Sequence, residues 1–172
     1  LVFGFSFSQT LTVVDGSSIS VTESSSIFID GLELEPSATY TIAGPNAFDR
    51  TSVPIVVGDN SSINRVYTMT EVLSDYLGVI SFSYEYSELN GISESDLVLE
   101  VQDGNGVWNN VIPTINETDN TLTYDFTALV SFTAVTASSV NATLSVDPIE
   151  INDFVKVYPN PATFYPKISA KA

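Results

Sequence analysis

The sequence predicts an all-β protein: an antiparallel β-sandwich, Ig-like or Greek-key in style, with little or no helix. Apolar and polar residues alternate along most of the chain, most clearly over residues 80–86 (ISFSYEY), and a period of two is typical of a strand with one buried face. Turn dipeptides such as Asp15-Gly16 and Asp30-Gly31 separate the alternating segments. A sheet with one apolar face needs a second layer to cover it, so two packed sheets are expected.

The first half of the chain is expected to form short strands joined by turns. Alternation marks these strands, at residues 11–14, 18–21, 27–29, 31–42, 53–57 and 65–70. The sequence Gly44-Pro45-Asn46 ends the fourth of them. Residues 71–77 are the one stretch where a single helical turn is predicted, and Gly78 would end it.

The second half is expected to begin with a β-meander. Its strand at residues 80–86 and its strand at residues 97–101 are separated by a break at residues 88–91. Asp103-Gly104-Asn105-Gly106 then supplies a hairpin turn before the chain re-enters at Trp108. Strands at residues 122–126 and 130–135 complete the sandwich.

The charge balance limits the partners of the protein. The 172 residues include 21 acidic and 5 basic residues, which gives a net charge of −16. Only Arg50 and Arg65 are basic before residue 150. A surface this acidic repels phosphate, so nucleic acid and anionic membranes are unfavourable partners and cations are favourable ones.

Several kinds of site are excluded by missing residue types. The chain has no Cys, so neither a disulfide nor a thiolate zinc site can form. It has no His, which removes His-dependent catalytic triads and His-ligated zinc. No apolar run approaches the ~20 residues that cross a bilayer, so no transmembrane span is expected.

The two ends differ in character from the middle, which leaves residues 10–139 as the sandwich domain. Residues 1–9 (LVFGFSFSQ) are aromatic and uncharged, and they end in small residues as a secretory signal does. A signal-peptide remnant is the favoured interpretation. The alternative is a retained strand, because large and small side chains alternate there, and such a strand could complete the sheet of a neighbouring subunit. Residues 140–153 are expected to be a linker containing Pro148.

The last segment, residues 154–172, carries a motif. Its sequence Val157-Tyr158-Pro159-Asn160-Pro161-Ala162-Thr163 resembles the opening of the C-terminal sorting domain of type IX secretion cargo, found on secreted proteins of Bacteroidetes-type bacteria. The resemblance implies that the type IX secretion machinery is a partner and that the protein is extracellular or attached to the outer-membrane cell surface. Its motif residues are Tyr158, Pro159, Asn160 and Pro161. Since such a domain normally continues for several more strands, this segment is expected to be its truncated start.

A second resemblance covers residues 82–108. The sequences YSELNG at 86–91 and ESDLVL at 94–99, followed by a Trp, resemble a β-sandwich module repeated in large surface proteins of the same bacteria. Residues 31–46 are similar to the segments that precede that module. The resemblance implies a stalk, spacer or adhesin, and it supplies no catalytic residue.

Two loops contain oxygen-bearing side chains that could bind Ca²⁺, the only cofactor the sequence suggests. The preferred pair is Asp103 and Asn105, and the other set is Asn116, Asp119 and Asn120. Neither matches a complete Ca²⁺ loop, and both have the composition of hairpin turns. The turn interpretation is therefore favoured, with a surface Ca²⁺ site as the alternative.

Other residues invite a carbohydrate-related interpretation. A pair of carboxylates among Glu85, Glu88, Glu94 and Asp96 could hydrolyse a glycosidic bond, but acidic residues are expected on a solvent-facing strand and loop without any chemistry. Trp108 and the eight tyrosines could form a platform that stacks on sugar rings, although a single Trp after a hairpin is more often a cap on the core.

The sequence thus favours a non-enzymatic, secreted structural or adhesive module of the cell surface. If residues 1–9 are retained, strand exchange between copies would make a fibre. The alternative function is a carbohydrate-binding module accessory to a secreted hydrolase, with a surface glycan as the partner of Trp108.

Overall fold

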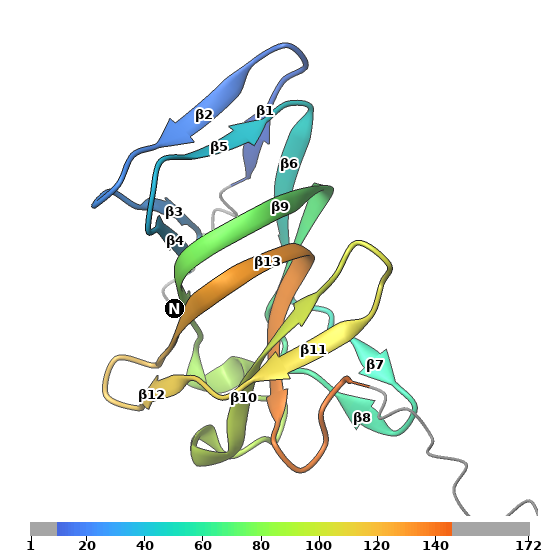
Figure 1. Cartoon of the computed structure of the whole chain (residues 1–172). Coiled ribbons are helices and arrows are strands. Elements are labelled where there is room, and N and C mark those ends of the chain that lie inside the picture. Colours follow the sequence, from blue (N-terminus) through green and yellow to red (C-terminus); the bar gives the residue numbers. More distant parts are fainter. Residues whose placement is uncertain (1–9, 146–172) are drawn as a thin grey trace, which may run out of the picture.

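The computed structural model describes residues 10–145, which form an almost entirely antiparallel β fold (Figure 1). The strands are β1 (Leu11–Val13), β2 (Ser18–Val21), β3 (Ile27–Ile29), β4 (Leu32–Pro36), β5 (Tyr40–Ala43), β6 (Asn46–Thr51), β7 (Val56–Val57), β8 (Asn60–Ser61), β9 (Val66–Ser83), β10 (Leu97–Gln102), β11 (Trp108–Val111), β12 (Thr114–Asn116) and β13 (Thr121–Ser139). The helical elements within the described residues are the single 3₁₀ turns η1 (Tyr86–Glu88) and η2 (Glu94–Asp96). The predicted fold class, all-β and antiparallel with almost no helix, is confirmed.

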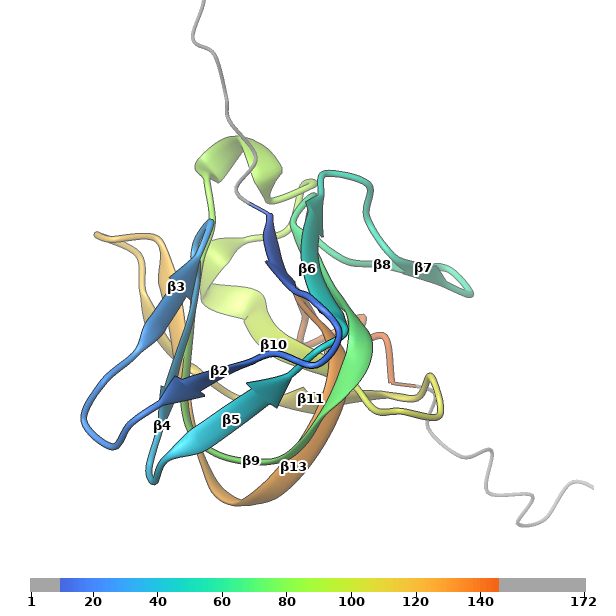
Figure 2. The same cartoon turned by 90° about the horizontal axis from the view of Figure 1, so that it is seen from above.

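Two long strands organise the main sheet. β9 and β13 pair along their length, and each takes part in both halves of the sheet. In one half the strands lie in the order β3-β4-β9-β13-β12, and in the other β1-β6-β9-β13-β10-β11. Seen from above, β9 and β13 curve around one side and connect the half that contains β4 with the half that contains β6 (Figure 2). The sheet therefore folds over so that its two halves face each other.

The bend occurs where the pairing of β9 with β13 is irregular. The register shifts three times between Phe126 and Ala134 of β13, and such bulges bend a strand. Gly78 of β9 lies beside this region with φ of +139°, paired with Pro36 of β4. A Cβ at this position would collide with the carbonyl oxygen of Glu35 and lie 2.7 Å from the Cα of Pro36. Glycine thus allows β4 to approach the bend.

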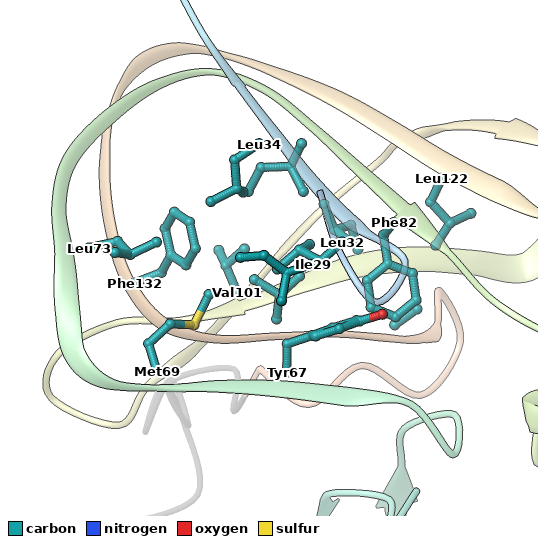
Figure 3. Close-up of a cluster of buried hydrophobic side chains, with 14 of the residues drawn as sticks. Ile29, Leu32, Leu34, Tyr67, Met69, Leu73, Phe82, Val101, Leu122 and Phe132 are labelled. Carbon is teal, nitrogen blue, oxygen red and sulfur yellow. The ribbon is translucent and has the colours of Figure 1, made fainter. Parts of the chain in front are cut away.

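One apolar core fills the space between the two halves. Figure 3 shows Leu32 and Leu34 of β4 in the same cluster as Val101 of β10 and Phe132 of β13. All four side chains are at most 3% exposed. A second contact is the edge-to-face pair of Tyr67 and Phe82, with ring centroids 5.6 Å apart. Burial of these large side chains is the main stabilising contribution to a two-layer fold.

Two expectations for residues 71–86 are wrong. Residues 71–77 lie inside β9 and not in a helical turn, because they pair with β13 at Leu73 and Tyr76 through the bend. The alternation at residues 80–86 predicted that Tyr86 faces the core, but the strand ends at Ser83 and Tyr86, in η1, is 74% exposed. Both errors arise because pattern alone does not show where a strand bends or ends.

The predicted meander is also only partly correct. β10 and β11 form the expected hairpin, but β10 pairs on its other side with β13 and not with the strand that precedes it. The 3₁₀ turns carry the chain from one half of the sheet to the other between β9 and β10. A strand that was not predicted, β6, begins at Asn46, where the sequence indicated a break.

Two further findings concern the ends and the membrane. Residues 1–9 and the sorting motif Tyr158-Pro159-Asn160-Pro161 lie outside the described residues, so the predictions made for them remain predictions. Among residues 10–145, no helix has the length and apolar character needed to cross a membrane.

Replacing Gly78 by alanine is expected to destabilise the protein strongly, because the new Cβ both meets the β4 backbone and requires a left-handed backbone conformation. The free energy of unfolding should fall by about 3 kcal/mol. Gly58→Ala is the matched control: Gly58 also has a positive φ (+61°), but nothing lies within 4 Å of its Cβ position, so only backbone strain of about 1 kcal/mol is expected. Urea unfolding followed by tryptophan fluorescence measures both, and equal losses would contradict this account of the bend.

Candidate functional site

Both arginines of the described chain converge on one carboxylate. The Nε of Arg65 donates to Oε2 of Glu88 at 2.7 Å, and the Nη2 of Arg50 lies 3.4 Å from Oε1 of the same residue. Nη1 of Arg50 also lies 3.3 Å from Oδ2 of Asp30. The side chains of Arg65 and Glu88 are only 7% and 12% exposed. We call Asp30, Arg50, Arg65 and Glu88 the arginine cluster.

The arginine cluster also binds the backbone of the β3–β4 turn. The carbonyl oxygen of Asp30 accepts hydrogen bonds from Nη1 of Arg65 and from the hydroxyl of Tyr67. Gly31 follows with φ of +103°, and a Cβ there would collide with the Arg65 guanidinium and lie 2.8 Å from the Tyr67 hydroxyl. The turn, two strands and η1 are therefore joined by one buried polar network.

Burial and hydrogen bonding act in opposite directions on Arg65. Burial lowers the pKa of its guanidinium, but the hydrogen bond to Glu88 and the interaction with Tyr67 outweigh that effect, so the net pKa is raised. Burial raises the pKa of the Tyr67 hydroxyl. The cluster thus holds a charged arginine and a neutral tyrosine at neutral pH, which suits a structural role.

Two of the acidic residues considered for glycoside hydrolysis, Glu88 and Glu94, bind different partners through their carboxylates. Glu88 belongs to the arginine cluster, and its Oε2 also accepts from the backbone N–H of Glu85 at 2.8 Å. Glu94 accepts a hydrogen bond of 2.9 Å from the hydroxyl of Tyr84. Burial and this bond raise the pKa of Tyr84. Asp96 contributes its backbone carbonyl, which accepts from the N–H of Val140.

The structure places Asp103 and Asn105 in the tight turn between β10 and β11. Oδ1 of Asp103 accepts hydrogen bonds from the backbone N–H groups of Asn105 (2.8 Å) and Val107 (2.9 Å). The bond from Val107 and then that from Asn105 lower the pKa of the Asp103 carboxyl. Geometry agrees with the turn interpretation, since this oxygen already binds two donors.

The second candidate loop has the same kind of geometry. Oδ1 of Asn116 accepts from the N–H groups of Thr118 and Asp119, and its Nδ2 donates to Oδ2 of Asp119 at 2.7 Å. Asn120 has φ of +50°, as a turn residue does. Within residues 10–145, no three acidic side chains are grouped closely enough to hold a metal ion.

Trp108 is buried, but not between the two halves of the sheet. Only 6% of it is exposed, and it packs with Ala134 and Leu144 on the outer face of β10, β11 and β13. Ile55 and Val57 cover this small cluster. We call these five residues the outer cluster. The ring is therefore not free to stack on a sugar in this conformation. Tyr86 is a large aromatic side chain that is well exposed.

Leu144 and Glu100 are the residues of this region that sequence analysis missed. Leu144 lies in the segment assigned to the linker, yet it is 1% exposed, so the packed part of the chain extends to Ser145. Glu100 is fully buried on β10. Its position in an alternating strand, between Leu99 and Val101, indicated an exposed residue, because nothing in the sequence shows that residues 140–145 cover that face.

Glu100 is only partly satisfied by hydrogen bonds. Its Oε1 accepts from the hydroxyl of Ser138 at 2.6 Å and from the backbone N–H of Leu144 at 2.7 Å, while Oε2 is buried without a partner. Burial raises the pKa of this carboxyl, and the two hydrogen bonds offset part of the effect. A buried carboxylate with one bare oxygen is costly when ionised.

Comparison with known proteins provides no assignment, since no protein-family model matches the chain and no curated protein matches it.

The variant Arg65→Met is expected to lower the free energy of unfolding by about 3–5 kcal/mol, because it leaves the buried Glu88 carboxylate without its closest partner. Arg50→Met is the matched control: Arg50 is 20% exposed and its contacts are longer than 3.2 Å, so a loss of about 1 kcal/mol or less is expected. Chemical denaturation at neutral pH distinguishes the two. A smaller loss for Arg65→Met than for Arg50→Met would show that the cluster does not depend on its buried pair.

The variant Glu100→Gln is expected to be more stable than the wild type at neutral pH. The folded-state pKa of Glu100 is raised, so ionisation opposes folding: its cost is absent below the ordinary value of 4.5 and complete above the raised value. The difference in the free energy of unfolding between Glu100→Gln and the wild type should therefore shrink as the pH falls through the raised pKa. Asp103→Asn should be less stable than the wild type at neutral pH, because the lowered pKa of Asp103 contributes stability there that is lost on acidification. Urea titrations between pH 3 and pH 8 measure both differences, and a pH-independent gain for Glu100→Gln would contradict the assignment.

Proposed function

We propose that the protein is a non-enzymatic, secreted structural or adhesive module of a bacterial cell surface. The observation that carries this proposal is that the polar side chains singled out by the sequence hold the fold together. Arg65 binds Glu88, Glu94 accepts from Tyr84, and Asp103 closes a backbone turn. Groups fixed in this way give a rigid body, which a spacer or stalk requires.

The distribution of charge supports an exterior position among similar modules. Eighteen carboxylates and two guanidinium groups lie in residues 10–145, so this part carries the entire net charge of −16. Since both guanidinium groups belong to the arginine cluster, they neutralise the partly buried carboxylates of Asp30 and Glu88 and not the remaining surface carboxylates. An acidic exterior keeps neighbouring copies apart and attracts cations, and uptake of Ca²⁺ at the surface is part of this proposal.

The proposed delivery route rests on the Tyr158-Pro159-Asn160-Pro161 motif. Its resemblance to a type IX sorting domain would take the protein through the outer membrane, with attachment to the cell surface or release. Residues 82–108 resemble a module of surface proteins from the same bacteria. The two resemblances therefore agree with one delivery route.

Strand exchange through residues 1–9 is the proposed basis of a fibre. β1 and β3 are the outermost strands of the two halves on one side, and the outer edge of each carries no strand from residues 10–145. An edge of this kind can accept an extended segment from a neighbouring copy. Residues 1–9 directly precede β1, so they would reach a neighbour from this same side.

Replacing Tyr158, Pro159, Asn160 and Pro161 by alanine is expected to abolish surface display. The experiment is immunogold labelling of intact cells that possess type IX machinery and express the complete reading frame. The control replaces Phe164, Tyr165, Pro166 and Lys167 by alanine, which alters the same tail outside the motif and should leave at least half of the labelling.

The same micrographs test the fibre. Deletion of residues 1–8 should leave surface label but remove any polymers. Surface labelling that is insensitive to the motif would refute the route, and polymers that survive the deletion would refute strand exchange.

A further inference from the structure

Two asparagines of the chain are followed by glycine, at Asn90-Gly91 and at Asn105-Gly106. This dipeptide is chemically labile, because a glycine has no side chain to hinder its backbone nitrogen from attacking the amide of the asparagine before it. The two dipeptides are equivalent in sequence. The structure distinguishes them by how firmly each asparagine is held.

The two glycines do not account for any difference in reactivity. Gly91 has φ of +81° and Gly106 has φ of +84°, and both residues are exposed. A Cβ at Gly91 would have no neighbour within 4 Å, and a Cβ at Gly106 would meet only the end of the Gln102 side chain, at 4.0 Å. The reactivity of each dipeptide therefore depends on its asparagine.

The side chain of Asn90 is bound to a distant segment. Its Nδ2 donates to the hydroxyl of Ser61 at 3.1 Å and to the carbonyl oxygen of Ser62 at 2.9 Å. Ser62 is fully buried, so this acceptor is fixed in place. The amide of Asn90 cannot turn towards the nitrogen of Gly91 unless both hydrogen bonds open.

Asn105 lies in the exposed turn between β10 and β11 (Figure 1). Within residues 10–145, its side-chain amide forms no hydrogen bond to a segment outside this turn; it interacts with the carboxyl of Asp103, whose pKa it helps to lower. The backbone N–H of Asn105 donates to Oδ1 of the same aspartate. Because these contacts lie within one short turn, a local opening of the turn releases them together.

The attacking group at Asn105 is the backbone nitrogen of Gly106. Its N–H donates to the carbonyl oxygen of Asp103 at 3.0 Å, and this bond has to open before the nitrogen can attack. Such an opening stays within the exposed turn. Asn90, in contrast, has to lose two hydrogen bonds to another segment, one of them to buried backbone. Since each hydrogen bond stabilises the closed state, the opening at Asn105 is the more frequent one.

We propose that Asn105 is a site of spontaneous covalent modification, at which the folded protein loses the side-chain amide as ammonia and acquires aspartate or isoaspartate, while Asn90 is protected by its hydrogen bonds to residues 61 and 62. The modification needs no enzyme. It also does not depend on the proposed secretion or on strand exchange at residues 1–9.

The reaction uses only the chain and water. The nitrogen of Gly106 attacks Cγ of Asn105, so that a bond between these two atoms closes a succinimide ring. The bond between Cγ and Nδ2 breaks, and the amide group leaves with the Gly106 proton as ammonia. Water then opens the ring. Opening at Cγ gives aspartate, and opening at the backbone carbonyl carbon of residue 105 gives isoaspartate, in which the main chain runs through the former side chain.

Either product changes the turn. A new carboxylate appears next to that of Asp103, so the net charge becomes more negative than −16 and the turn attracts cations more strongly. Isoaspartate also lengthens the backbone by a methylene group. The lengthening falls where N–H groups of Asn105 and Val107 donate to Asp103 and close the hairpin.

The test measures the two asparagines separately in the full chain. The folded protein is incubated at mildly alkaline pH, and samples taken over time are denatured and cleaved after glutamate. Cleavage yields residues 89–94 (LNGISE), which contain Asn90, and residues 101–117, which contain Asn105. Exchange of the amide for a carboxyl makes a peptide heavier by about 1 Da, and tandem mass spectrometry locates the change. Asn105 should react about ten-fold faster than Asn90.

Two variants and a denatured sample serve as controls. In concentrated urea neither asparagine is held, so the two rates should agree within about two-fold. The variant Asn105→Gln should abolish the mass increase at residue 105, because a glutamine would have to close a larger ring. The variant Ser61→Ala removes one of the two hydrogen bonds that hold Asn90, and it should raise the rate at Asn90 about five-fold while the rate at Asn105 stays unchanged.

Two results would overturn the proposal. One is an intact Asn105 in the folded protein after a period in which the urea-denatured chain has reacted completely, which would show that the turn protects it. The other is a rate at Asn90 in the folded protein that equals or exceeds the rate at Asn105, which would show that the bonds to Ser61 and Ser62 give no protection.

Discussion

The structure depends on the neutralisation of Glu88 by Arg65. Arg65 directly precedes the long bent strand β9, and Glu88 lies in the 3₁₀ turn η1, between the two halves of the sheet. Through Asp30, the same network reaches the β3–β4 turn. In a chain so rich in acidic residues, both cations of the described part are used internally. A buried ion pair is weak evidence of net stability. It nevertheless favours one packing of these elements, because any packing that separated Arg65 from Glu88 would leave a buried charge unpaired.

The bend in β9 and β13 converts one sheet into two layers. Without it, the apolar faces of β4 and β10 would be exposed on opposite ends of a flat sheet, since both strands pair directly with the bent strands. Register shifts and Gly78 allow the bend, and the core cluster stabilises it. This arrangement accounts for the body, and residues 142–145 add a third layer over β10. The covering segment buries Glu100 with its Oε2 unpartnered. The other carboxylate oxygen of Glu100 accepts a hydrogen bond from the backbone of that segment.

The ion pairs and the covering segment lie in different parts of the molecule. The arginine cluster and the core give a rigid acidic body, which supports the proposed surface module. The surface under residues 142–145 is polar where it binds the backbone of that segment and apolar where it packs against Leu144.

The sequence by itself determined the fold class, the positions of most short strands and the hairpin turn at Asp103, because period-two alternation and turn chemistry are local properties. It also determined the acidic character of the body. Only the tertiary structure decided that residues 71–77 belong to a bent strand, that Glu88 binds arginine and that Trp108 packs outside the main core. Each of these depends on segments that are distant in the sequence. Above all, the role of Leu144 and the burial of Glu100 arise where residues 142–145 meet β10, and no local pattern records that contact.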